Sequence, residues 1–342
     1  MKRAVMKYVT IATAIATMAL LAGCGGDGSN PFQPGGDTPT DPGTPTDGSA
    51  IPETLAGNVT SIRYDATTQR VVVEGVTLDE VPYLPEYQRN AALDANYNGY
   101  QVYTAQDDPL DRHSTAVVLQ SSGTGVTGRV RAGAVQTGGP RNRYFGGTYW
   151  ERDGAYDAPD VSKTSGLVSY AGNYIGLTNV GVRDGMLLPV DPDTPEELTP
   201  SRAAQVTGDI YLSADFADNQ VEGNIYNRVL VPTGQALPSI VLVATGISDD
   251  GTFSGGEVEY DSQQQDPFYV GIDPTVGNDI GDYAGVFAGQ DSKSVGGGVR
   301  LDQWDGPNDM LGYEDEEEYG TFVLEQCGTA FSNQSICDQV KP

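Results

Sequence analysis

Apolar and polar residues alternate along much of the chain after residue 50, and this period of two predicts β-strands rather than helices. The clearest case is 210–216, in which every second residue is apolar. Asp218 and Asn219 then favour a turn, and the alternation resumes at Val221. The two stretches predict a hairpin with one buried face and one face in water.

The polar positions of the second stretch define the face that we expect in water. They are Glu222, Asn224, Tyr226 and Arg228. In this interpretation all four side chains lie on the outer wall of a sheet. Charges there disfavour a barrel that spans a membrane, because the outer wall of such a barrel contacts lipid.

Similar hairpins recur and predict an all-β fold. Turns are expected at 249–251 and near Asp291, with one strand beginning near Leu167 and another ending at Cys327. Counting the segments between these limits predicts an eight-stranded antiparallel β-barrel, a closed sheet without free edges. We assign residues 161–342 to this barrel.

The segment 51–160 is also rich in β patterns and predicts a smaller sheet domain before the barrel. One hairpin is expected to turn near 66–69 and another around 121–125. A polar stretch at 157–160 then favours a domain boundary.

Glycine is dense in 281–304, and two roles compete to explain it. A phosphate-binding loop needs a helix directly after it, and no helical pattern follows here. A small barrel needs glycine where its strands bend strongly, with aromatic side chains packing over the gaps. We therefore interpret Gly296, Gly297 and Gly298 as a bent barrel strand.

Residues 1–23 have the pattern of an export signal, with positive charges near the start and a short apolar stretch after them. The segment continues as Leu-Ala-Gly-Cys, and the cysteine is Cys24. This ending resembles the bacterial lipobox, which implies that Cys24 carries a lipid. The alternative is an ordinary secretory signal with a cysteine there by chance.

Residues 24–50 are dense in Gly, Pro, Asp and Thr and predict a disordered tether, because they offer almost no apolar surface to bury. The residue after the cysteine is Gly25. Lipoproteins that enterobacteria retain at the inner membrane typically have Asp at this position. The resemblance therefore implies the outer membrane, on its periplasmic or cell-surface face.

The formal net charge of −28 argues against nucleic acid as a partner, because no basic patch is present to displace counterions. An anionic membrane surface is an equally poor fit, so membrane attachment is expected to come from the lipid. Cys327 and Cys337 are the remaining cysteines, and outside the cytosol an isolated pair predicts a disulfide. Metal binding is the alternative for this pair, but two cysteines without a nearby histidine make a poor site.

The order of lipobox, tether, small sheet domain and glycine-rich barrel resembles the transferrin-binding protein B family, in which such a lobe is described as a handle plus an eight-stranded barrel. The stretch from Gly285 to Gly289, its turn and the glycine pair at 296–297 carry the resemblance, together with 170–179. The best-known members of the family have two such lobes, and this chain has room for one. None of their ligand contacts matches here, so the ligand-binding residues stay unknown.

Catalytic and cofactor motifs are weak. Residues 123–128 match GxGxxG, but the residues after them alternate like a strand, so we predict a hairpin turn. His113 is the single histidine, and with Asp111 and Ser114 it could suggest a triad. We predict instead an exposed loop histidine, while haem ligation by His113 or a tyrosine stays open.

Acidic and aromatic clusters complete the candidates. The runs 191–197 and 314–318 lack calcium-loop spacing and are expected to be solvated loops. Tyrosines and one tryptophan crowd the region before the barrel, where either ordinary sheet packing or a protein interface would use them. They are Tyr83, Tyr87, Tyr97, Tyr100, Tyr103, Tyr144, Tyr149 and Trp150.

These features predict a non-enzymatic outer-membrane lipoprotein that binds a ligand, with no resident metal or cofactor. The family resemblance implies an iron- or haem-carrying partner that is passed to an outer-membrane transporter. A lipocalin-like barrel that encloses a small molecule or lipid is one alternative, and a structural or adhesive surface protein is another. A hydrolase ranks lower because no nucleophile elbow or zinc motif is present.

Overall fold

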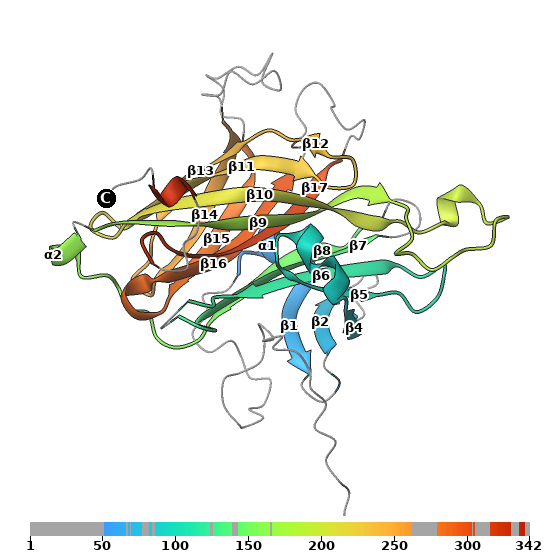
Figure 1. Ribbon diagram of the computed structural model, residues 1–342, viewed down its shortest axis with the longest axis horizontal. Coiled ribbons are helices and arrows are strands. Elements are labelled where there is room, and N and C mark those ends of the chain that lie inside the picture. Colours follow the sequence, from blue (N-terminus) through green and yellow to red (C-terminus); the bar gives the residue numbers. More distant parts are fainter. Residues whose placement is uncertain are drawn as a thin grey trace, which may run out of the picture.

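The fold consists of two β-sheets, one packed against the outer wall of the other (Figure 1). It was obtained as a computed structural model, which describes residues 51–65, 68, 70–76, 82–83, 86–123, 126–138, 143–164, 166–261, 279–302, 304, 315–329 and 335–338. The predicted export signal 1–23, the lipidation site Cys24 and the tether 24–50 lie outside the described residues. Within the described part, no helix combines the length and the apolar character needed to cross a membrane.

The first sheet, which we call the handle, has the strand order β1-β2-β4-β5-β6-β7-β8, with β3 paired to β2. Its strands are β1 (Val59–Asp65), β2 (Arg70–Val76), β3 (Pro82–Tyr83), β4 (Glu86–Arg89), β5 (Gln101–Ala105), β6 (His113–Gln120), β7 (Val130–Gly138) and β8 (Gly146–Arg152). Helix α1 (Glu53–Ala56) precedes β1, and the 3-10 helix η1 (Ala91–Tyr97) lies between β4 and β5. The sheet curls until its ends nearly meet. The Asn58 N–H beside β1 donates to the Gly146 carbonyl of β8 at 2.8 Å.

The second sheet is a closed barrel, which confirms the predicted count of eight strands and the all-β class. Its order is β10-β9-β17-β16-β15-β14-β13-β11, and β11 pairs back to β10 to complete the ring. The strands are β9 (Leu167–Val182), β10 (Arg202–Asp215), β11 (Gln220–Leu230), β13 (Ile240–Gly246), β14 (Thr252–Tyr260), β15 (Asp279–Ala288), β16 (Ser294–Asp302) and β17 (Glu317–Gln326). Two-residue β12 (Gln235–Ala236) pairs with β11, and short α2 (Val161–Thr164) precedes β9.

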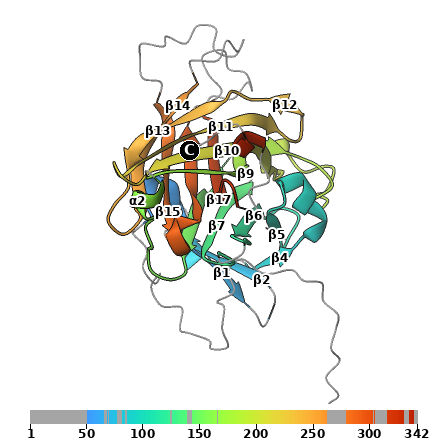
Figure 2. The ribbon, with the colours of Figure 1, turned by 60° about the vertical axis from the view of Figure 1, so that its left-hand side comes forward.

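The handle packs on one side of the barrel, as two views show (Figures 1 and 2). One contact cluster joins Val130 and Trp150 of the handle to Ala284 and Val323 of the barrel. A second joins Tyr100 and other handle residues to Ile175 and Leu177 of β9. Burial of these apolar surfaces holds the two sheets together.

The glycines of β16 have a role that the sequence did not predict. A Cβ at Gly296 would lie 2.7 Å from the Val130 side chain, and one at Gly298 would lie 2.5 Å from the Thr148 hydroxyl. Both positions therefore allow the handle to approach the barrel wall closely, in addition to any effect on strand curvature.

One predicted face is wrong at Arg228, which is buried inside the barrel. The pairing shifts between Thr207 and Asp209, so Gly208 of β10 lies opposite both Asn227 and Arg228. Asn227 adopts a φ of 52°, the left-handed conformation typical of a β-bulge. The extra residue reverses the alternation, and Arg228 points inward where strict alternation places it outside.

Most of the aromatic residues before the barrel are core residues, so the idea that they form an external interface is wrong for them. Tyr87, Tyr97, Tyr100, Tyr103, Tyr149 and Trp150 are all buried. Tyr97 and Tyr100 do lie at an interface, but it is the internal one between handle and barrel. The side chain of Tyr83 lies outside the described residues.

Candidate functional site

The barrel has two unlike ends. At one end its strands are joined by short turns at 216–219, 247–251 and 289–293. At the other end the connections are 183–201, 231–239, 261–278 and 303–316, and much of the last two lies outside the described residues. Long connections at one rim of a rigid barrel are the usual place for a binding surface, so we take this long-loop end as the candidate site.

Connection 183–201 extends from the right of Figure 1 and meets the handle. The Leu188 N–H donates to the Gln106 side-chain oxygen at 2.8 Å, which joins this connection to the β5–β6 loop. Arg183 pairs with Glu196 across the base of the connection at 3.2 Å. Loops 106–112 and 183–201 therefore form one continuous surface, which we call the loop surface.

Apolar side chains are exposed on the loop surface. Leu110 is 49%, Leu188 39% and Leu198 37% exposed. Among the described residues the other large apolar side chains with comparable exposure are Val161 and Leu167, next to the short-turn end. Three of the five exposed large apolar side chains of the described residues thus belong to the two loops of the loop surface, and a protein-binding site uses exposed apolar side chains of this kind.

The same two loops carry exposed carboxylates. Asp107, Asp108, Asp111, Asp191, Asp193 and Glu197 are all exposed. Two nearby cations are engaged within the protein, since Arg183 pairs with Glu196 and Arg112 donates to the Arg143 carbonyl. The loop surface therefore combines apolar contacts with an excess of negative charge, which complements a partner that presents positive charge.

A buried ion pair lies inside the barrel beneath the long loops. The Arg228 guanidinium donates to Glu318 at 2.8 Å, and both side chains are fully buried. Glu318 also accepts a hydrogen bond from the Tyr174 hydroxyl at 2.6 Å. Burial, and then the charge of Glu318, raise the pKa of the Tyr174 phenol well above its ordinary value, so the phenol stays a donor.

This polar cluster is connected to the long loops. Arg228 donates to the Pro238 carbonyl at 3.0 Å, which fixes the 231–239 connection. Its guanidinium carbon lies 4.7 Å from the centre of the Trp304 ring, directly after β16. Glycine makes the room, because a Cβ at Gly176 or Gly320 would overlap Glu318 or Tyr174. The cluster thus forms a rigid floor under the candidate site.

The burial of Glu318 corrects the prediction that 314–318 is a solvated acidic loop. Glu316 and Glu318 are buried, while Glu317 pairs with Arg300 at 3.1 Å on the barrel wall. Glu318 faces the interior because β17 begins within the acidic run and its alternation takes over. By contrast, 191–197 is largely exposed, as expected.

His113 is also not where the sequence predicted. It is the first residue of β6, is 2% exposed, and faces the barrel rather than solvent. Ser114 is buried on the opposite face of the strand, and Asp111 is exposed on the preceding loop. The three residues that could suggest a triad are therefore not brought together.

The GxGxxG match lies in the β6–β7 hairpin loop, and β7 follows it instead of a helix. The backbone N–H groups of Ser122 and Gly123 donate to the Glu325 carboxylate of the barrel at 3.0 and 2.7 Å. These donors bind a side chain of the chain itself, so the motif links handle to barrel. Within the described residues, no group of three or more His, Cys, Asp or Glu side chains is placed to hold a metal ion.

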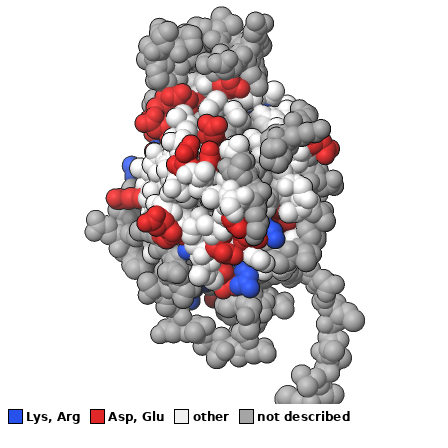
Figure 3. Space-filling model, turned by 90° about the vertical axis from the view of Figure 1, so that its left-hand side faces the viewer, with Lys and Arg blue, Asp and Glu red and all other residues white. Residues whose placement is uncertain are grey.

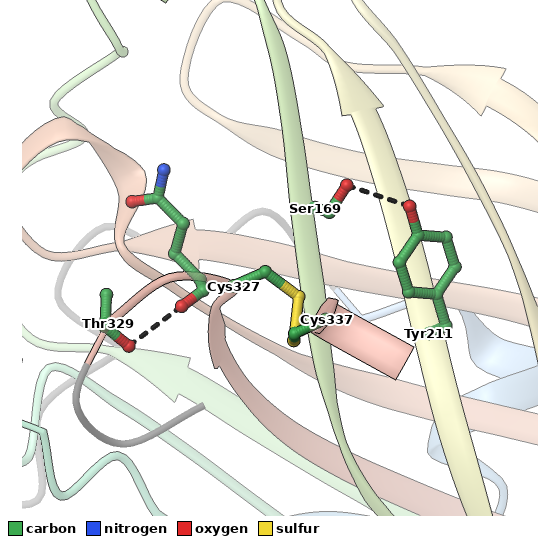
Figure 4. The surroundings of a disulfide bond; sticks show 6 residues. Ser169, Tyr211, Cys327, Thr329 and Cys337 are labelled. Atoms are coloured by element: carbon green, nitrogen blue, oxygen red, sulfur yellow. Dashed lines mark hydrogen bonds between the residues drawn. A yellow bond between two sulfur atoms is a disulfide. The ribbon is translucent and has the colours of Figure 1, made fainter. Parts of the chain in front are cut away.

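The C-terminal tail is attached next to the short turns. Cys327 follows β17 and is disulfide-bonded to Cys337 of the 3-10 helix η6 (Ser335–Asp338), with the two Cα atoms 5.2 Å apart (Figure 4). The Cys327 N–H donates to the Ser169 carbonyl of β9 at 2.8 Å. Viewed from this side, the molecule presents many acidic and few basic side chains (Figure 3). The negative charge is therefore not confined to the loop surface.

These observations define a class: an all-β protein with a curled sheet that braces a packed eight-stranded barrel. No family model matches the chain, and no curated protein is similar enough in sequence to be matched. Solved structures that resemble it include transferrin-binding protein B from Haemophilus parasuis Hp5, as two mutant proteins, and isotype 1 of that protein from serogroup B Neisseria meningitidis.

The identities to these three structures are 11%, 13% and 9%, with TM-scores of 0.34, 0.31 and 0.33. The matches cover 75%, 78% and 79% of this chain, and 51%, 54% and 52% of the other chains. The chain thus spans about half the length of the structures it resembles.

Proposed function

We propose that this protein is a non-enzymatic lipoprotein of the outer membrane that binds a protein ligand through its loop surface. The lipobox-like ending at Cys24 and the tether 24–50 support the anchor. The observation that carries the binding proposal is the asymmetry of the barrel, with its long connections at one end above a filled interior. The ligand is expected to present apolar side chains within a positively charged surface.

The filled interior argues against the lipocalin-like alternative. Large side chains, including Tyr170, Phe253, Phe287 and Trp304, are fully buried within the barrel. An eight-stranded barrel is narrow enough for side chains to fill it. Recognition on the rim is therefore favoured over enclosure of a small molecule.

The anchor is tested by fractionation. A Cys24→Ser variant should move from the membrane fraction to the soluble fraction, because it has no thiol to carry the lipid. Metabolic labelling with a radioactive fatty acid should mark the wild type and leave the variant unlabelled. A variant that stays membrane-bound would count against lipid anchoring.

The ligand is sought by affinity capture on the tagged full chain, from cells grown with and without iron. The sequence resemblance to proteins that bind an iron carrier is the reason for that condition. Mass spectrometry and haem absorbance identify an iron- or haem-carrying partner or an outer-membrane transporter.

The site is tested with matched variants. Leu188→Ser with Leu198→Ser should abolish capture, whereas Leu167→Ser, a leucine of similar exposure at the other end of β9, should retain it. Equal capture by both variants would place the binding site elsewhere. No capture in any arm would favour a structural or adhesive surface protein.

A further inference from the structure

The contact between handle and barrel contains a polar seam next to the loop surface. His113 and Thr115 lie on β6 on the same side as Val117, and Gln136 lies on β7 on the same side as Ala134. Val117 and Ala134 belong to the cluster that packs against the barrel. Thr115 and Gln136 are direct cross-strand partners, so the three polar side chains are neighbours on the barrel-facing side of the handle.

Barrel residues and η1 enclose this seam. A Cβ at Gly138, the cross-strand partner of His113, would lie 1.9 Å from the Ser201 carbonyl oxygen. The charged groups near His113 are Arg202 at the start of β10 and Asp184 in the 183–201 connection. Tyr97 of η1 is near the same two groups. Asp184 binds Arg202 through both carboxylate oxygens, at 2.6 to 3.1 Å.

The polar atoms of the seam lack hydrogen-bond partners among the described residues. They are Tyr97 Oη, His113 Nδ1, Thr115 Oγ1, Gln136 Nε2 and Gln136 Oε1, all fully buried. A buried polar group without a partner loses its hydration without compensation, which weakens the contact that buries it. This part of the interface is therefore costly to keep closed.

The middle of the same interface is different. The Tyr100 hydroxyl lies within hydrogen-bond distance of the Asn173 and Thr321 carbonyls, at 3.1 and 3.3 Å. Asn98 donates to the Tyr174 carbonyl, and Asn173 donates back to the Asn98 carbonyl. The interface is thus well bonded in its middle. At the His113 end it is held by the Leu188–Gln106 bond and by a 2.9 Å bond between the Tyr144 and Ser201 hydroxyls, next to the unpaired atoms of the seam.

We propose that the handle and barrel form an acid-operated joint, which opens along this seam when His113 takes up a proton. A charged imidazole there would be buried without a partner for Nδ1, and the repulsion from Arg202 outweighs the attraction of Asp184. Parting of the two surfaces lets water reach it and relieves both costs. Loops 106–112 and 183–201 lead directly into His113 and Arg202, so opening separates the two halves of the loop surface.

The direction of the pH effect follows from linkage. Burial, and then Arg202, lower the pKa of His113 to about 4 in the closed form, from an ordinary value of 6.5. The closed form therefore has its full stability above pH 6.5 and loses it as the pH falls toward 4. Within that window the ratio of open to closed protein should rise about tenfold per pH unit.

The single histidine allows a direct test on the full chain in mild detergent. With ¹³C-labelled histidine, the one imidazole signal should titrate well below pH 6.5. Hydrogen exchange at pH 7 and pH 4.5, corrected for the intrinsic rate, should show increased exchange in the first residues of β6 and β10. Protection of β15 and β16 should stay unchanged, which separates opening from acid unfolding. An ordinary histidine titration, or unchanged exchange at β6, would overturn the proposal.

Two variants sharpen the test. His113→Gln cannot gain charge, so its exchange at β6 should not respond to acid; a full response would contradict the proposal. Thr115→Val removes one unpaired hydroxyl with little change of shape and should shift acid opening to lower pH. An unchanged or higher opening pH in Thr115→Val would refute the role of the unpaired groups. A ligand bound across the two halves of the loop surface would be released when they separate. That consequence rests on the proposed function, whereas the measurements above need no ligand.

Discussion

The two halves of the barrel interior differ in what fills them. Beneath the short turns, Phe287 packs against Tyr170, Phe216 and Phe253, with ring centres 5.0 to 5.5 Å apart. Beneath the long loops, Arg228, Glu318 and Tyr174 form a buried polar cluster. A core selected for stability alone would be apolar throughout, because burying an ion pair costs desolvation. The half of the interior that bears this cost lies beneath the end that we propose to bind the ligand.

The largest expected effect comes from breaking the ion pair in the polar half. Glu318→Gln leaves the Arg228 charge buried without a counterion, and the free energy of unfolding should fall by about 3–5 kcal/mol. Denaturant unfolding followed by circular dichroism measures the change. Glu222→Gln, at an exposed position on the same barrel, is the matched control and should change stability by less than about 0.5 kcal/mol.

Replacing both charges sharpens the comparison. Arg228→Met combined with Glu318→Leu removes the desolvation cost along with the attraction, so the double variant should be more stable than Glu318→Gln. If the double variant is less stable than both the wild type and Glu318→Gln, the attraction within the ion pair exceeds its desolvation cost. The contrast between the two halves of the barrel interior then does not hold.

The next effect belongs to the short-turn end. Replacement of Cys327 and Cys337 by Ala should lower the free energy of unfolding by roughly 2–3 kcal/mol, because the disulfide closes a short loop in the unfolded chain. Thermal unfolding of the variant and of the reduced wild type should agree. A variant as stable as the oxidised wild type would show that the tail unfolds independently of the barrel.

A smaller effect is expected at the Asp184–Arg202 pair beside the loop surface. The hydrogen bond from Arg202 is the main reason that the pKa of Asp184 lies below its ordinary value. The pair therefore contributes its full stability above the ordinary pKa of an aspartate, and this stability is lost as the pH falls through the lowered pKa of Asp184. The Asp184 carboxylate is 36% exposed, and Arg202, although 4% exposed, also donates to the Ala203 carbonyl and the Gln205 side chain. Asp184→Asn should therefore cost only about 1 kcal/mol at pH 7. The gap in melting temperature between variant and wild type should shrink as the pH approaches 3. A gap that is constant with pH would show that the charge of Asp184 does not matter.

How much the sequence could predict follows from how local each signal is. The strands of the short-turn half follow from strict alternation and compact turns such as 249–251, and these predictions are confirmed. The prediction that Arg228 faces water was wrong because a single bulge residue reverses the alternation, and the alternation of the sequence does not indicate a bulge. The prediction that His113 is an exposed loop residue was wrong because the barrel, whose residues are distant in sequence, buries it. The floor of the candidate site joins residues from β9, β11 and β17, and no local pattern connects them.

The loop surface should show the smallest effect on stability and the largest on binding. Leu188→Ser with Leu198→Ser removes apolar side chains that are already partly in water, so the free energy of unfolding should change by less than about 0.5 kcal/mol. Leu167→Ser should change it equally little at the opposite end. If capture of the ligand falls only in the first variant, the exposed leucines at the long-loop end serve binding and not stability. If Leu188→Ser with Leu198→Ser instead destabilises the fold by more than about 1 kcal/mol, those leucines belong to the core of the connection, and the binding surface must be sought among the exposed carboxylates of the same two loops.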